Sequence, residues 1–221
     1  MCGDQVVLQG DFMTVFELLS CRCYSLAAIY VAEIKRRQPD GPYLVGGYSV
    51  GGVVAFEAVR QLLEDGNEVE KLFLIDTACP TLASSMPSAL VDFLDSIDYV
   101  GMVNEDEIRE KNRGRPITND HFTLARKQLM KYRVSKLPGR KIPQVVLFSA
   151  RKGVDKQDKL ARPEVLPEEQ RVVDWFLNDR TDDGSFGWDE ILGSVSVVRA
   201  DGNHFSMMKP PTVSQLVHAT L

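Results

Sequence analysis

The distribution of apolar and polar positions divides the chain into three parts. In the first part, apolar side chains at helical spacing predict a helix over 26–37, which Pro39 closes. An apolar run predicts a strand at 43–48, a second helical pattern covers 53–64, and a further apolar run at 69–75 is typical of a buried parallel strand. Strand, helix and strand in this order form a βαβ unit, so the predicted fold class is α/β.

The middle part, residues 81–140, has a different pattern. It contains no strand-like run, but amphipathic helical patterns occur at 89–97, 105–112 and 120–134. A helical insertion between two strands of an α/β sheet is typical of a lid over an active site, and we expect a lid here. An ordinary helical excursion remains the alternative.

The last part returns to alternating strands and helices. The expected elements are a strand at 145–149, a helix at 168–177, a polar loop at 179–185, a strand at 195–199 and a terminal helix from 212. We therefore expect residues 1–221 to form a single domain, with a mostly parallel sheet and flanking helices.

Composition and charge narrow the range of functions. The net charge of −5 argues against a nucleic-acid partner, and the chain has no run near the ~20 apolar residues that span a bilayer. Four cysteines occur without metal-ligand spacing, so we expect reduced thiols and neither a disulfide framework nor a metal site. The first residues lack the pattern of a secretory signal, which favours a cytoplasmic location. No cofactor is implied.

The sequence GGYSVGG at 46–52 carries the main chemical signal. It joins the predicted strand to the helix that follows, with small residues two positions before and after Ser49. This pattern is typical of a nucleophile elbow, in which a tight turn presents the serine at the top of the sheet. A phosphate-binding loop is the alternative, but Gly52 stands where that motif needs lysine, and Tyr48 stands where the dinucleotide motif needs glycine.

A nucleophilic serine needs a base and an acid. Of the three histidines, His121 and His218 lie in predicted helices, whereas His204 follows the last strand in the sequence DGNHF. Asp76 ends the strand after the elbow helix, and Asp155 follows the next strand in a lysine-rich loop. The order serine, aspartate, histidine is the α/β-hydrolase order. His204 is thus the candidate base and Asp76 the candidate acid, with Asp155 as the alternative acid.

Several segments together resemble a known family. They are PDGPYLVGGYSVGG at 39–52, FE at 56–57, LID at 74–76 and GNHF at 202–205. This combination is similar to the thioesterase domains of type I polyketide synthases, especially the thioesterase/Claisen cyclase domains of fungal non-reducing synthases. The resemblance extends from about Ser25 to the end of the chain. It implies an α/β-hydrolase fold with a helical lid.

The resemblance implies a serine thioesterase. Ser49 would take a polyketide acyl chain from the phosphopantetheine arm of an acyl carrier protein, with His204 as base and Asp76 as orienting acid. The N–H of Val50 would be one oxyanion donor. Release would follow by hydrolysis, lactonisation or Claisen cyclisation, and the partner would be the carrier protein or the synthase. Two alternatives are a standalone esterase or editing hydrolase, and a catalytically weak remnant that only binds a carrier.

Residues 1–24 depart from the family pattern. Family members have further strands before the first predicted helix, and a loop among them donates the second oxyanion N–H. We therefore expect the N-terminal strands to be partly missing. The strand 43–48 would then lie at an open sheet edge, through which the chain could self-associate.

Overall fold

The computed structural model describes residues 23–82, 86–96, 131–139, 141–154, 162–181 and 184–212. Its centre is a parallel sheet of four strands in the order β1-β2-β3-β4. The strands are β1 (Tyr43–Tyr48), β2 (Val69–Ile75), β3 (Gln144–Ala150) and β4 (Ser196–Ala200). The predicted α/β class and parallel sheet are confirmed, and β1 lies at the edge of these four strands.

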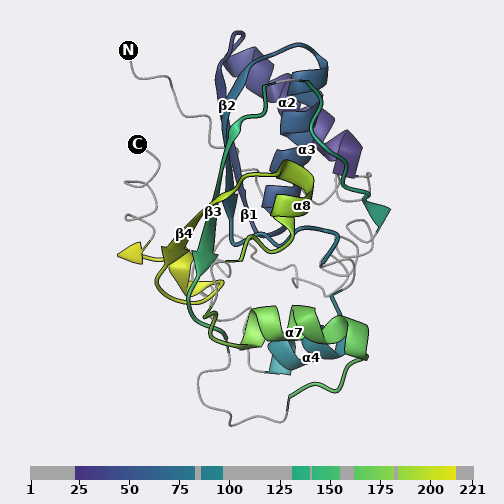
Figure 1. Ribbon diagram of the computed structural model, residues 1–221, viewed down its shortest axis with the longest axis vertical. Helices are drawn as coiled ribbons and strands as arrows, with labels where there is room; N and C mark the ends of the chain where they lie inside the picture. The colour runs from purple at the N-terminus through teal and green to yellow at the C-terminus, as the bar shows by residue number, and fades with distance from the viewer. Residues whose placement is uncertain are drawn as a thin grey trace, which may run out of the picture.

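Helices cover one face of the sheet and the ends of its strands. The long helices α2 (Cys23–Arg37) and α3 (Val50–Glu64) lie over one face together with the short α8 (Trp188–Leu192) (Figure 1). The helices α4 (Ser88–Ser96) and α7 (Gln170–Leu177) lie beyond the carboxyl ends of the strands (Figure 1). Two 3-10 turns, η1 (Pro167–Glu169) and η2 (Ser206–Met208), complete the described elements.

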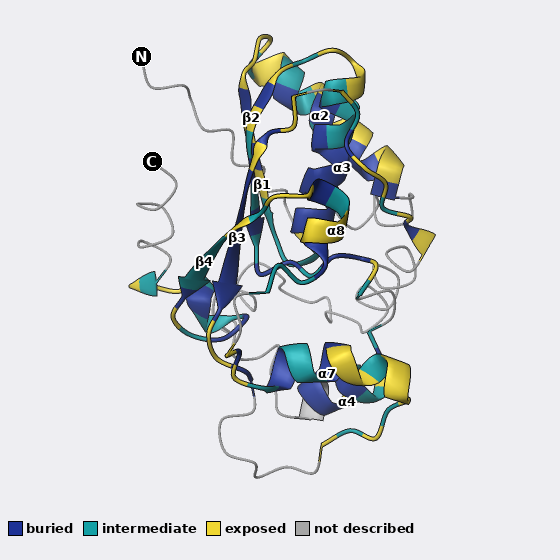
Figure 2. Ribbon diagram, viewed as in Figure 1, coloured by how far each residue is buried: buried dark blue, intermediate teal, exposed yellow. Residues whose placement is uncertain are grey.

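The alternation of side chains along the strands explains this packing. Leu72 and Leu74 of β2 are buried in the same cluster as α3, whereas Phe73 and Ile75 belong to the cluster on the opposite face. On the α3 side, Phe56 packs against Trp188 of α8 with ring centroids 5.1 Å apart. Figure 2 shows α3 as largely buried, while α2 exposes its outer side. The central core therefore lies between α3 and the sheet.

A second apolar cluster fixes α7 over the ends of the strands. Leu90 and Phe93 of α4 pack with Val173 and Phe176 of α7. The backbone N–H of Val154, which follows β3, donates a hydrogen bond to the carbonyl of Phe176 at 2.9 Å. This arrangement brings the C-terminal end of α7 to the edge of the sheet where parallel strands end.

Most element boundaries differ from the predictions by one to three residues, and three of the differences have a clear reason. The helix predicted from position 53 begins at Val50, because glycines that indicate a turn in sequence form its first helical turn. The predicted helix 120–134 was extended too far, since residues 132–138 have no regular secondary structure. The sequence pattern also missed α8, which is only five residues long and too short to show a period.

Other predictions fall partly outside the described residues. Within the expected lid, 81–140, the structure describes residues 81–82, 86–96 and 131–139, so the helical pattern at 105–112 and most of that at 120–134 lie outside the described residues. The predicted terminal helix from 212 lies outside the described residues after its first position. Among the helices that the structure does describe, none has the length and apolar content needed to cross a membrane.

Candidate active site

A tight turn between β1 and α3 holds Ser49 in an uncommon conformation. Its φ of 55° and ψ of −126° lie where few residues other than glycine are found. The turn leaves no room for side chains on two flanking glycines. A Cβ on Gly47 would come within 2.6 Å of the backbone nitrogen of Gly52, and a Cβ on Gly52 would lie 2.8 Å from Cβ and Cγ2 of Thr77. Gly47 and Gly52 are therefore steric requirements of the turn.

Thr77 secures this turn from the neighbouring strand. Its hydroxyl lies 3.0 Å from the carbonyl oxygen of Ser49, to which it donates a hydrogen bond. The N–H of Ser49 donates to the carbonyl of Ile75 at 2.9 Å. Both bonds join the end of β1 to the end of β2, so the strained serine is held by its backbone while its side chain stays available.

Three side chains from the carboxyl ends of the strands meet at this turn. Nδ1 of His204 lies 2.8 Å from Oδ2 of Asp76, and Nε2 lies 3.1 Å from Oγ of Ser49. A carboxylate only accepts hydrogen bonds, so Nδ1 carries the proton and Nε2 is free to accept from the serine hydroxyl. The three residues thus form a continuous hydrogen-bonded chain.

Asp76, the acid of this hydrogen-bonded series, is buried and ionised. Asp76 has no exposed side-chain surface, and its Oδ1 accepts a hydrogen bond from the N–H of Ala150 at 2.9 Å. Arg180 donates to both carboxylate oxygens, with Nη2 3.1 Å from Oδ2. Burial alone would raise the pKa of Asp76, but the hydrogen bond from His204 and the charge of Arg180 outweigh burial and lower that pKa to about 2.

The loop that carries His204 is held by its own polar side chains. The side-chain oxygen of Asn203 accepts from the N–H of Ser206 at 2.9 Å, and the hydroxyl of Ser206 accepts from the N–H of Asn203 at 2.8 Å. Gly202 has a φ of +88°, and a Cβ there would lie 2.5 Å from the same hydroxyl. From β1, the hydroxyl of Tyr48 donates to the carbonyl of His204 at 2.7 Å. These bonds fix the position of the imidazole.

Aromatic rings surround the imidazole. Trp175 and Phe176 of α7 approach it edge-on with centroid distances of 5.5 and 5.2 Å, and the ring of Tyr48 stacks on it at 5.0 Å. Such walls limit the access of water to the imidazole, which strengthens electrostatic interactions there.

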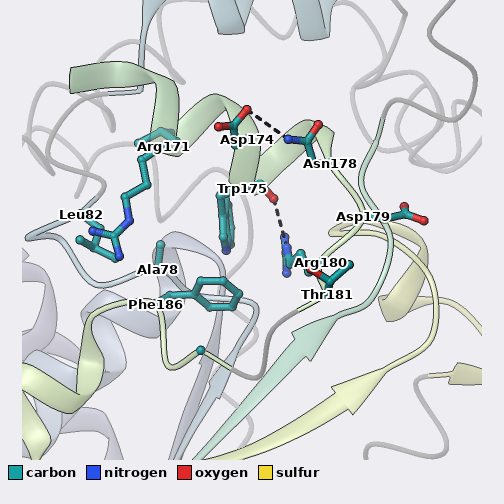
Figure 3. A pocket seen from close by; sticks show the side chains of 12 residues that line it. Ala78, Leu82, Arg171, Asp174, Trp175, Asn178, Asp179, Arg180, Thr181 and Phe186 are labelled. Atoms are coloured by element: carbon teal, nitrogen blue, oxygen red, sulfur yellow. Dashed lines mark hydrogen bonds between the residues drawn. The ribbon is translucent and has the colours of Figure 1, made fainter. Parts of the chain in front are cut away.

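A pocket of about 280 Å³ lies next to this site, between α7 and the loop that follows it (Figure 3). The rings of Trp175 and Phe186 and the guanidinium of Arg180 line it, and Arg171 projects from α7 at its side (Figure 3). The indole Nε1 of Trp175 is buried and has no hydrogen-bond partner within the described residues. Neither Ser49 nor His204 lines the pocket, so it borders the hydrogen-bonded chain and does not contain it.

The structure brings together Ser49, Asp76 and His204, as the sequence predicts. Val50 is the first residue of α3, so its N–H has no acceptor within the helix and stays available for an oxyanion. Three residues weighed at the sequence level lie outside the described residues, namely Asp155, His121 and His218. Within the described ranges, no cluster of three or more potential ligands could hold a metal ion.

Sequence reasoning missed two participants, Arg180 and Trp175. Arg180 stands in a polar stretch that reads as a solvated loop, and Trp175 occupies an apolar position of a predicted helix. A signal for Arg180 is absent from its neighbourhood in sequence, because Asp76 lies 104 positions away. A conserved pattern across relatives could have found it, but a single sequence does not contain one.

A parallel sheet with a strained serine at the turn after β1, and a histidine and an aspartate after two other strands, defines a serine hydrolase of the α/β class. Residues 18–221 match the thioesterase domain family, and the chain belongs to that family.

Fungal proteins are among its relatives in sequence. The chain is 35% identical over 214 residues to the non-reducing polyketide synthase terA of Aspergillus terreus, covering 96% of this chain and 10% of that protein. It is 37% identical over 215 residues to the conidial pigment polyketide synthase alb1 of Aspergillus fumigatus, covering 90% of this chain and 10% of that protein. The chain therefore spans about a tenth of the length of these curated relatives.

A solved thioesterase structure shares the fold. The thioesterase domain of NocB, in covalent complex with a fluorophosphonate nocardicin G analogue, has a TM-score of 0.61 and 22% identity to this chain. The match covers 90% of this chain and 74% of that one. The α/β-hydrolase-type fold expected from the sequence is confirmed by this likeness and by the family match.

Proposed function

We propose that the chain releases a polyketide acyl group from an acyl carrier protein through an acyl-enzyme on Ser49. The observation that carries this proposal is the hydrogen-bonded chain from Ser49 through His204 to Asp76, with Nε2–Oγ and Nδ1–Oδ2 distances of 3.1 and 2.8 Å. A serine hydroxyl is a weak nucleophile until an adjacent base removes its proton, and this geometry supplies that base.

The reaction begins when Oγ of Ser49 attacks the thioester carbonyl and its proton passes to Nε2 of His204. The carboxylate of Asp76 stabilises the imidazolium that forms and keeps the ring oriented. Negative charge develops on the carbonyl oxygen, where the N–H of Val50 and the N-terminal end of the α3 dipole stabilise it. His204 then returns the proton to the departing thiol, which leaves an acyl ester on Ser49.

The substrate and partner are inferred from the relatives. Two of them are named as polyketide synthases, and the present chain aligns with about a tenth of each. We infer that the acyl group is a polyketide presented on a phosphopantetheine arm, and that an acyl carrier protein is the partner. Water, an internal alcohol or an internal carbon nucleophile would complete release from the acyl-enzyme.

Intact-mass measurement with a fluorophosphonate tests the nucleophile. A single adduct on the folded chain that is lost in Ser49→Ala supports the proposal, whereas an adduct that persists in the variant refutes Ser49 as the nucleophile. A second assay compares acyl-carrier thioesters with simple esters. Preference for the carrier-bound substrate supports polyketide release, and equal or higher turnover of simple esters indicates a standalone esterase.

Product mass then distinguishes the modes of release. Hydrolysis adds one water to the released chain, while lactonisation or Claisen cyclisation releases it without water. Self-association through the edge strand β1 stays a prediction, and sedimentation velocity over a range of protein concentrations tests it.

A further inference from the structure

Arg180 donates hydrogen bonds to Asp76, the acid of the triad that Ser49, His204 and Asp76 form. Its Nη1 and Nη2 donate to the two carboxylate oxygens of Asp76, and Nη1 also lies 3.2 Å from the carbonyl oxygen of Ala150. Its Nε donates to the carbonyl of Trp175 at 3.1 Å. Only 4% of the Arg180 side chain is exposed. A two-pronged, buried arginine is strongly oriented, and a single substitution would leave its partner charge without compensation.

Aromatic rings and backbone bonds hold this arginine in place. The guanidinium carbon lies 4.5 Å from the ring centroid of Trp175 and 5.2 Å from that of Phe186 (Figure 3). The N–H of Arg180 donates to the carbonyl of Arg151 at 2.9 Å, and its own carbonyl accepts from the guanidinium of Arg199. The rings that pack on the guanidinium and the hydrogen bonds of the main chain leave Arg180 little conformational freedom. Its position is therefore fixed before a substrate binds.

The two hydrogen bonds from Arg180 complete the set of donors around the Asp76 carboxylate. Asp76 accepts from His204, from the N–H of Ala150 and twice from Arg180. A carboxylate offers about four lone-pair sites, so each has a donor and the group cannot rotate without breaking at least one bond. Oδ2 therefore stays directed at Nδ1 of His204.

The charge of Arg180 lies directly behind the carboxylate that faces the imidazole. Three titratable or charged groups face His204 in the described part of the chain, namely Asp76 after β2, Tyr48 at the end of β1 and Arg180 behind the carboxylate. Burial raises the pKa of Tyr48, which keeps it neutral. The helix α7 and the imidazole's own loop present aromatic rings, those of Trp175, Phe176 and Phe205. The described surroundings of the imidazole therefore contain one anion, Asp76, and one cation, Arg180.

We propose that Arg180 is a positioning residue of the triad, which orients the carboxylate of Asp76 and lowers the pH above which His204 can act as a base. A carboxylate without the arginine would stabilise the imidazolium more strongly, and His204 would then stay protonated, and inactive as a base, to a higher pH. The inference rests on the proposed role of the triad and is independent of the acyl chain and of the carrier.

The test measures the rate of reaction with a fluorophosphonate from about pH 5 to about pH 9, the range in which histidine titrates. In that reaction Oγ of Ser49 forms a bond to phosphorus, fluoride leaves and the serine proton passes to His204. Two variants separate charge from geometry. Arg180→Gln removes the charge, and Arg180→Lys keeps the charge but cannot bind both carboxylate oxygens.

Arg60→Gln is the matched control. Arg60 makes a comparable two-pronged pair with buried Glu57, with N–O distances of 2.7 and 2.8 Å, but it lies within α3 away from the triad. Its loss costs stability in the same way and leaves the charges around His204 unchanged.

In Arg180→Gln the acidic limb of the pH–rate profile should move to higher pH by about one unit. This is the lower end of the pKa shift that an adjacent charge causes. At a pH on the acidic limb, the Arg180→Gln variant should therefore react about tenfold more slowly than the wild type. In Arg180→Lys the limb should stay in place while the plateau rate falls about tenfold, because lysine is a point charge that does not fix the carboxylate plane. Arg60→Gln should move neither.

Each other result refutes part of the reasoning. An unmoved limb in a folded Arg180→Gln variant overturns the proposal, since a purely structural arginine would lower the rate equally at every pH. If Arg180→Gln does not fold, the test rests on the plateau rate of Arg180→Lys. A plateau rate equal to that of the wild type would overturn the positioning role. A wild-type chain that does not react with the probe refutes the proposed function itself, which separates the two failures.

Discussion

Gly52→Ala tests the steric argument for the serine turn. Gly52 lies in the first turn of α3, and an added Cβ would come within 2.8 Å of both Cβ and Cγ2 of Thr77, with Oγ1 closer still. The Thr77 Cβ is attached directly to the backbone and cannot rotate away. Relief therefore requires the end of β2 and the start of α3 to separate, which stretches the 3.0 Å bond from the Thr77 hydroxyl to the carbonyl of Ser49.

The structure also offers a matched control one residue away. Gly51 lies in the same helical turn, and a Cβ there would meet no atom within 4 Å. Gly51→Ala should therefore gain helix propensity, worth up to about 1 kcal/mol, without a steric penalty. Gly52→Ala gains the same propensity but pays for overpacking, which costs typically about 1–3 kcal/mol and more where backbone must move.

We expect the two variants to differ by about 3 kcal/mol in free energy of unfolding, with Gly52→Ala the less stable. For a chain of this size, each kcal/mol shifts Tm by about 2–4 °C, so the two midpoints should differ by roughly 6–12 °C. Thermal unfolding followed by circular dichroism measures this difference, and urea titration checks its sign. Gly52→Ala should also react more slowly with a fluorophosphonate, because the serine backbone is displaced. Midpoints within about 2 °C of each other would show that the turn has room for a side chain at position 52 and that Gly52 is not a steric requirement.

Three further substitutions probe the polar contacts around the site. Because the folded-state pKa of Asp76 is lowered to about 2, its ionised form stabilises the fold above about pH 4, and this contribution of about 2 kcal/mol is lost as the pH falls through about 2. Asp76→Asn should flatten that part of the pH dependence in urea titrations, and an unchanged slope would contradict it. Tyr132→Phe removes the hydroxyl that donates to buried Glu57 at 2.9 Å and should cost about 1–3 kcal/mol in unfolding free energy, whereas a cost below about 0.5 would show that the remaining donors suffice. Tyr48→Phe removes the 2.7 Å bond to the carbonyl of His204, so it should cost about 1 kcal/mol and slow fluorophosphonate labelling; an unchanged labelling rate would show that the loop holds the imidazole without it.

The strands and the serine turn could be predicted because their signals are local. β1 and β2 have the bounds of their mostly apolar runs, since strands buried in a parallel sheet are rich in apolar residues. The turn at Ser49 is recognisable because the glycines that it requires, Gly47 and Gly52, lie close to the serine in sequence. Asp76 and His204 can be predicted for a related reason, because each lies in the segment after a strand and the carboxyl ends of parallel strands meet at one edge.

The rest depends on contacts between segments far apart in sequence. Arg180 is an arginine in a polar loop, and nothing nearby distinguishes it from a solvated charge. Its guanidinium reaches the end of β2 through the packing of α7 against α4, the bond from the N–H of Val154 to the carbonyl of Phe176, and the bond from its own N–H to the carbonyl of Arg151. The early start of α3 has a similar cause. Glycine disfavours a helix intrinsically, but a side chain at Gly52 would collide with Thr77, so tertiary contact overrides the local preference.

The position of α7 also makes the triad and the neighbouring pocket parts of one structure. Trp175 contributes its ring to the pocket, its edge to the imidazole of His204 and its carbonyl to Nε of Arg180. The guanidinium of Arg180 forms part of the pocket wall and at the same time holds Asp76. A substitution that enlarges the pocket at Trp175 therefore removes a ring from both His204 and Arg180, and the groups that activate the serine lose part of their support. The shape of the pocket and the support of Asp76 and His204 are therefore coupled in this chain, because Trp175 and Arg180 contribute to both.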